Sequence, residues 1–232
     1  MAKFTSNKDT KAVERAEVAT LRLASLCGLD VPDVELFDNP KGYPVAIISR
    51  FDRFEKARIP YISAQTMLDR PTADNGTYAE IAEAIRVHGA DPKADLLSLF
   101  QRILFSILVS NVDDHLKNHA FLYAGRKRWR LSPIFDVNPF PERFKQLKTA
   151  IADPSDNAAS IEQLLEYAFY FEIDKVEALK IISTMAETVK GAWKGFCLEA
   201  GMSRDEITEY TPAFEHQETE FALNLKKTRM FI

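Results

Sequence analysis

The sequence predicts an α+β fold that is mostly α-helical, with most of its strands in the first part of the chain. Six of the 11 prolines fall between Pro32 and Pro92, among short apolar runs such as residues 43–48. This pattern is typical of strands joined by loops. After Ser155 only Pro212 remains, and helix-start signatures recur there. With 232 residues, 46% of them hydrophobic, the chain can build one domain or two small lobes around a shared cleft.

The charge and hydropathy of the chain exclude several classes of partner. The formal net charge is -4, so no overall positive field would hold the protein on nucleic acid or an anionic membrane. The most apolar stretch, residues 96–109, contains Gln101 and Arg102 and is too short to span a bilayer. The first residues lack the apolar core of a signal peptide. We therefore expect a cytoplasmic protein with no membrane partner.

A first helix is predicted over residues 11–27. Apolar or small residues recur there at helical spacing, Asp9 or Thr10 can begin the helix, and Gly28 can end it. Glu17 lies on the apolar stripe, where a carboxylate is costly unless a cation pairs with it, and Lys3 is a candidate. The pattern alone favours the alternative, in which Glu17 lies at the edge of the stripe in water.

Further helices are predicted in the middle and at the back of the chain. Residues 96–110 are apolar nearly all round, which indicates a central helix buried on several sides. Three later sites combine a capping residue with a Glu or Gln three positions on, namely Ser160 with Gln163, Asp174 with Glu177, and Ser203 with Glu206.

The segment after the central helix carries the residues with the clearest chemistry. Within residues 110–123, Asp113 and Asn118 are separated by four residues, and Asp136 follows a predicted hairpin. Phosphoryl transfer needs a carboxylate that accepts the proton of the attacking hydroxyl, together with an amide oxygen and a second carboxylate that hold Mg²⁺. In this hypothesis Asp113 is the base, and Asn118 and Asp136 are the metal ligands.

Two alternatives remain open from the residues themselves. His115 and His119 are spaced i, i+4 near two aspartates, which could form the metal site of a hydrolase; more often such residues are structural. Residues 126–130 combine four basic side chains with a tryptophan and could contact nucleic acid. We favour a solvated hairpin tip for them, because the overall charge is negative.

Four runs resemble the HipA family of serine/threonine kinases, the toxin half of a type II toxin-antitoxin pair. They are NVDDHLKNHAFLY at 111–123, WRLSPIFDVNPFP at 129–141, ISRFDR at 48–53 and EVATLRLASLCGLDVP at 17–32. The resemblance extends from Lys3 to about Phe214. It implies a protein-kinase-like helical C-terminal lobe with a truncated small lobe.

The resemblance also implies roles for individual residues. Asp113 matches the catalytic aspartate of the family, and Asn118 and Asp136 match its magnesium ligands. Lys3 matches the lysine that touches the ATP phosphates and pairs with a helix glutamate, here Glu17. ATP and Mg²⁺ are therefore the expected cofactors.

The resemblance places a hinge at Ser49 to Phe51, where the backbone of Ser49 and Phe51 would bond the adenine edge. We expect residues 1–48 to be a remnant of the small lobe and residues 49–232 to be the helical lobe. The glycine-rich loop of the family would precede Lys3, so we expect this chain to lack it.

The resemblance finally implies partners. These are a small HipB-like DNA-binding antitoxin, through which alone the protein would contact DNA, and a protein substrate with a Ser or Thr hydroxyl, for which the translation machinery is one candidate. The alternative is a catalytically inactive or split HipA-like fragment that acts as a partner-binding module.

Overall fold

The computed structural model is mixed and mostly helical, as predicted, and it describes residues 1–228 except 5–11, 38–43, 56 and 143–145. The strands are β1 Ala2–Phe4, β2 Val34–Phe37, β3 Val45–Ile48, β4 Arg53–Phe54, β5 Ala57–Arg58, β6 Tyr61–Ser63, β7 Ala120–Gly125 and β8 Arg128–Leu131. The helices are α1 Val13–Leu26, α2 Ala64–Met67, α3 Tyr78–His88, α4 Pro92–Leu108, α5 Ile161–Glu166, α6 Lys175–Glu199, α7 Arg204–Phe214 and α8 Gln217–Thr228, with a 3₁₀ turn at Ala168–Phe171.

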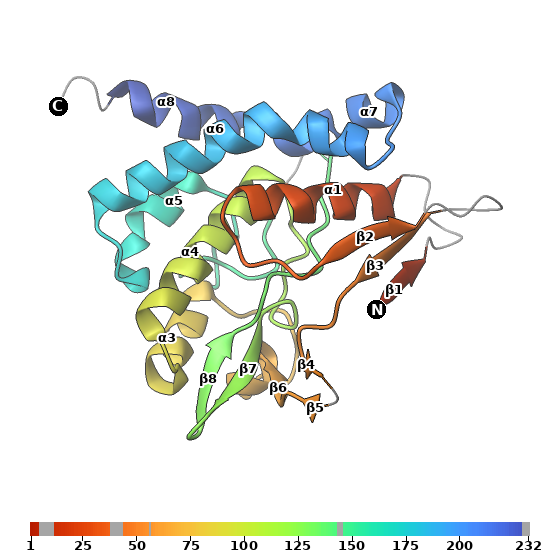
Figure 1. Ribbon diagram of the computed structural model, residues 1–232. Coiled ribbons are helices and arrows are strands. Elements are labelled where there is room, and N and C mark those ends of the chain that lie inside the picture. The colour runs from red at the N-terminus through yellow and green to blue at the C-terminus, as the bar shows by residue number, and fades with distance from the viewer. Residues whose placement is uncertain (5–11, 38–43, 56, 143–145, 229–232) are drawn as a thin grey trace.

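Small antiparallel sheets flank the helical layer (Figure 1). In the first, β1 is an edge strand and pairs with the central β3, which also pairs with β2. Lys3 is opposite Ala46, which is opposite Leu36, so these three side chains share one face of the sheet. A second sheet has the order β6-β7-β8, and β4 and β5 form a short ribbon.

The helices pack around one continuous hydrophobic core. Helix α1 crosses between the first sheet and the long helix α6 (Figure 1). Buried side chains of the core run from Ala16 in α1 to Ala222 in α8. Helix α4 lies at its centre, buried nearly all round as its composition predicts. Because this core extends across residue 48, the predicted division into a small-lobe remnant and a helical lobe stays a prediction.

The helix boundaries test the capping signals. The three predicted caps at the back of the chain are confirmed, since Ser160, Asp174 and Ser203 each accept the backbone N–H three residues on. Helix α1 begins at Val13, two residues later than predicted, without a side-chain cap. The proposed caps at 9 and 10 lie outside the described residues. Gly28 ends the helix at φ +84°, a conformation that favours glycine.

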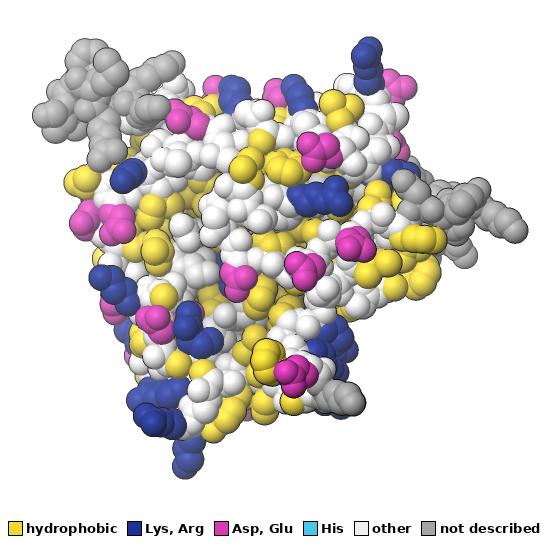
Figure 2. All heavy atoms as spheres, viewed as in Figure 1, with side chains coloured by type: hydrophobic (Ala, Val, Ile, Leu, Met, Phe, Trp, Pro, Cys, Tyr) yellow, Lys and Arg dark blue, Asp and Glu magenta, His cyan; other side chains and the backbone are white. Residues whose placement is uncertain are grey.

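The basic cluster at 126–130 forms the turn and the start of β8 in the β7–β8 hairpin. Lys and Arg side chains gather at the lower end of the molecule in Figure 2, where Figure 1 places this hairpin. Arg130 pairs with Asp95, and Trp129 packs edge-on against Tyr123. Within the described part of the chain, no helix has the length and apolar character needed to cross a bilayer.

Replacing the buried tryptophan of α6 should destabilise the fold strongly. The Trp193 ring stacks on Phe214 with centroids 4.6 Å apart, and the side chain is almost fully buried. We expect Trp193→Ala to lower the free energy of unfolding by about 3–5 kcal/mol, because it leaves a cavity in the core. Urea denaturation measures this change. The matched control is Leu198→Ala in the same helix, where the side chain is exposed; an equal loss in both variants would contradict the prediction.

Candidate active site

A lysine and two carboxylates form an ion cluster between β1, α1 and the segment after β8. Lys3 Nζ lies 2.5 Å from Glu17 Oε1 and 2.5 Å from Asp136 Oδ1. Glu17 is 2% exposed, so the alternative in which it lies in water is wrong and the pairing implied by the resemblance is confirmed. The cluster joins three segments that are distant in the sequence.

The electrostatics of the cluster keep Lys3 charged. Burial alone would lower the pKa of Lys3, but the neighbouring carboxylates of Glu17 and Asp136 outweigh burial and raise it. Burial raises the pKa of Glu17, and the Lys3 ammonium offsets this only in part. The charged form of Glu17 therefore depends on its pairing with Lys3, since an unpaired charge at a buried position would be costly.

Asp136, the third member of the ion cluster, has an unusual backbone conformation. Its φ is +58°, in the left-handed region that aspartate tolerates better than most residues. Asn138 Nδ2 donates to Asp136 Oδ1 at 3.3 Å, and the Asn138 N–H donates to Asn111 Oδ1 at 3.2 Å. Asn138 thus ties the Asp136 segment to the loop that carries Asp113.

The Asp113 loop follows α4 and is held by side-chain contacts to its backbone. Asn118 Nδ2 donates to the Asp113 carbonyl oxygen at 3.1 Å. Because the Asn118 amide donates through nitrogen, its oxygen remains as a ligand atom. The carboxylate of Asp113 is exposed, whereas Asn118 is buried. The loop therefore fixes the backbone of Asp113 and leaves its side chain accessible.

The neighbouring aspartate anchors this loop in the core. Asp114 accepts hydrogen bonds from the Tyr78 hydroxyl at 2.6 Å and the Ser106 hydroxyl at 3.2 Å, and lies 3.1 Å from His119 Nε2. Burial alone would raise the pKa of Asp114. The charge and hydrogen bond of His119 and the two hydroxyls outweigh burial and hold this pKa below its ordinary value.

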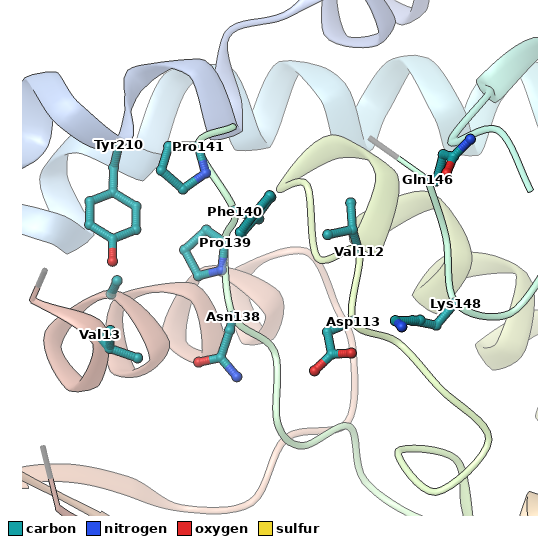
Figure 3. Close-up of a pocket in the computed structure, with 11 residues that line it drawn as sticks. Val13, Val112, Asp113, Asn138, Pro139, Phe140, Pro141, Gln146, Lys148 and Tyr210 are labelled. Atoms are coloured by element: carbon teal, nitrogen blue, oxygen red, sulfur yellow. The ribbon is translucent and has the colours of Figure 1, made fainter. Parts of the chain in front are cut away.

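A cavity of about 490 Å³ opens beside Asp113 (Figure 3). Asp113 and Lys148 line one side of it, and Asn138 lies between Asp113 and α1 in this view. The remaining lining is mostly apolar: Val13, Ala16, Val112, Pro139, Phe140 and Pro141, with Gln146 and Tyr210. The cavity can receive a chain segment that brings a reactive group to Asp113.

A second cavity, of about 290 Å³, lies at the predicted hinge. Ser49, Phe51 and Phe135 line it, and the rings of Phe51 and Phe135 are 5.3 Å apart. Phe135 directly precedes Asp136, so this cavity adjoins the ion cluster. The Ser49 N–H donates to the Asp33 carbonyl at 2.9 Å. Of the Ser49 backbone groups, only the carbonyl is therefore left for a ligand.

The donor set suits a hard cation. Asn118 offers an amide oxygen, and Asp136 a carboxylate that is 39% exposed; oxygen ligands of this kind bind Mg²⁺. Within the described ranges, no group of three or more His, Cys, Asp or Glu side chains is placed to hold a metal. His119 is instead part of the buried Asp114 cluster, which favours its structural interpretation.

The structure brings the predicted residues together in three sets. Lys3, Glu17 and Asp136 are in contact; Asp113 and Asn118 share one loop; Ser49 and Phe51 line the hinge cavity. Sequence reasoning gave no role to the residues that connect and anchor these sets, Asn138 and Asp114. Their signal was a polar residue two positions after Asp136 and a second acidic residue beside Asp113.

The first sheet, the ion cluster and the helical layer define a kinase-like fold, and comparisons with known proteins agree. The model of the HipA-like C-terminal domain matches residues 1–193, and the chain belongs to this family. It is 30% identical over 153 residues to a Haemophilus influenzae protein named "Putative kinase", covering 58% of this chain and 44% of that protein. It is 27% identical over 199 residues to "Putative kinase Y4mE" of Sinorhizobium fredii, and the match covers 80% of this chain and 40% of that protein. The chain thus spans less than half the length of these relatives.

Two solved structures share the fold. A chain of the Shewanella oneidensis MR-1 complex of HipA, HipB and operator DNA matches with a TM-score of 0.72 and 16% identity, over 98% of this chain and 57% of that chain. The Helicobacter pylori proinflammatory kinase CtkA matches with a TM-score of 0.67 and 14% identity, over 100% of this chain and 87% of that chain. These similarities confirm the predicted fold class.

The buried Asp114 cluster should make stability depend on acid pH. A carboxyl with a lowered pKa in the folded state contributes stability above its unfolded pKa of about 3.9, and this contribution is lost as the pH falls through the folded value. We expect Asp114→Asn to lower the free energy of unfolding by about 3 kcal/mol at pH 7.

The difference in the free energy of unfolding between wild type and Asp114→Asn should become smaller below about pH 4. Urea titrations at several pH values measure it, with the exposed Asp74→Asn as control. A difference that stays constant down to pH 2.5 would show that the ionised form of Asp114 contributes nothing.

Proposed function

We propose that the protein is an ATP- and Mg²⁺-dependent kinase that phosphorylates a Ser or Thr hydroxyl of a protein. The observation that supports this most strongly is the arrangement of an ion cluster and an exposed carboxylate, linked by Asn138, each next to a cavity of suitable size. Bound ATP would supply the phosphoryl group, and Mg²⁺ the charge that neutralises it.

Each residue has a separate task in this proposal. Asp113 orients the acceptor hydroxyl and takes its proton, as its exposure to the larger cavity allows. Asn118 and Asp136 hold the metal through oxygen atoms. Lys3, kept charged and positioned by Glu17, binds phosphate oxygens in place of its present contact with Asp136.

The hinge cavity is the proposed adenine site. The Ser49 carbonyl and the Phe51 N–H would bond the base edge, while the Phe51 and Phe135 rings provide apolar contact. In this assignment residues 1–48 act as the small-lobe remnant and residues 49–232 as the helical lobe.

The biological setting follows from the family. We assign the protein to the toxin component of a toxin-antitoxin pair, with a HipB-like DNA-binding antitoxin as partner and DNA contact only through that partner. The support is the named complex of HipA, HipB and operator DNA, whose HipA-type fold this chain shares.

Replacing the proposed base should abolish transfer without unfolding the protein. Asp113 is exposed and its carboxylate supports no described contact, so Asp113→Asn should keep the melting temperature and nucleotide affinity. General-base catalysis is worth about 10²–10⁴-fold, so we expect kcat to fall by that factor. Transfer of labelled phosphate to a mixture of proteins measures it. Asp205→Asn, at an exposed site on α7, is the control; equal rates in all three proteins would refute the role of Asp113.

Binding of the nucleotide should raise the melting temperature, and it should raise it further when magnesium is present. A ligand at 100 times its Kd stabilises the native state by about 2.7 kcal/mol. We expect a rise with ATP and Mg²⁺, a smaller rise with EDTA, and loss of the magnesium-dependent part in Asp136→Asn. No shift at millimolar nucleotide would instead favour the alternative function, a partner-binding module without catalysis.

A further inference from the structure

Two hydrogen bonds hold the backbone that carries Lys148 next to the proposed base. The Lys148 N–H donates to the Val112 carbonyl at 3.1 Å, and Thr149 Oγ1 donates to the Asp114 carbonyl at 2.8 Å. The acceptors are the residues on either side of Asp113. The backbone at 148 and 149 therefore runs along the base and cannot shift without breaking one of these bonds.

The side chains of Lys148 and Asp113 enter the same space. Both are exposed, both line the cavity of about 490 Å³, and the ammonium end of Lys148 is directed toward Asp113 in Figure 3. No carboxylate among the described residues lies within ion-pair distance of Lys148. The ammonium is therefore available to a ligand in the cavity.

The rest of this cavity offers no comparable charge. Among its described lining residues Lys148 is the only cation and Asp113 the only anion. The other polar side chains are the amides of Asn138 and Gln146 and Tyr210, which carries a hydroxyl. Lys148 is therefore the cation that can bind a negatively charged group that reaches Asp113 through this cavity.

We infer that Lys148 is a further catalytic residue, which contacts the phosphoryl group as it reaches the acceptor hydroxyl; this rests on the proposed kinase function. Asp113 takes the hydroxyl proton while the hydroxyl oxygen forms its bond to phosphorus. The bond from phosphorus to the leaving diphosphate breaks, and its electron pair stays on the diphosphate oxygen. Lys148 keeps its proton throughout and offsets charge on the phosphoryl oxygens.

Charge favours a phosphoryl group over an acidic side chain of the substrate as the ligand of Lys148. A substrate carboxylate held by Lys148 would lie close to the Asp113 carboxylate, and two like charges at short range repel. A phosphoryl group must approach Asp113 in any case, because the acceptor hydroxyl that it reacts with is held by Asp113. A cation at this place lowers the cost of that approach.

The test compares Lys148→Ala, Lys148→Arg and wild type in binding as well as in rate. Calorimetry with ADP, Mg²⁺ and fluoroaluminate reports on the transferring group, and ADP with Mg²⁺ serves as the reference. Loss of one charge-stabilising contact costs about 10²-fold in kcat. We expect that Lys148→Ala lowers kcat by this factor and lowers the affinity for the fluoroaluminate complex by a similar factor. The affinity for ADP and the KM for the acceptor protein should be unchanged.

Lys148→Arg keeps the charge and should recover most of the loss. Lys93→Ala, at an exposed site in the first turn of α4, should behave as wild type. If wild type transfers phosphate and Lys148→Ala does so equally well, the inference fails while the proposed function stands. A rise in acceptor KM alone would assign Lys148 to substrate recognition and overturn the inference. If wild type binds no nucleotide, both fail together.

Discussion

The contact of one lysine with two carboxylates organises the site. Lys3 lies on an edge strand, Glu17 on a helix that is packed against α6, and Asp136 in a segment that follows the β7–β8 hairpin. Each partner alone would be an uncompensated charge, at a buried position in the case of Glu17. The cluster therefore ties the edge strand to the helical layer and to the segment that carries Asp136.

A second set of contacts makes the loop after α4 rigid where it is chemically exposed. Asp114 is buried and contacts Tyr78, Ser106 and His119, whereas Asp113 lines the cavity. Two adjacent aspartates thus have opposite environments. Buried polar contacts of this kind hold an exposed side chain in place, which is what a proton acceptor requires.

The sequence was informative where the signal is local. Apolar periodicity and capping residues predicted the fold class, the buried α4 and the starts of α5, α6 and α7, because those signals lie within one turn of the helix they specify. The pattern placed Glu17 in water, since a stripe on a helix carries no information about a lysine on a distant strand. The resemblance to a family supplied that pairing. The contacts of Asn138 and Asp114 depend on how separate segments meet, and no spacing rule predicts them. The roles of Asp113, Asn118, Asp136, Ser49 and Phe51 stay predictions.

The central claim is that Asn118 and Asp136 hold one divalent ion beside the nucleotide. Mn²⁺ substituted for Mg²⁺ in the presence of ATP tests it directly, because its unpaired electrons broaden the nuclear resonance signals of nearby groups. Our account predicts that the side-chain amide signal of Asn118 and the backbone signals of 136–138 disappear first. Broadening confined to other acidic surfaces, or none at Asn118 and Asp136 with ATP bound, would contradict the account.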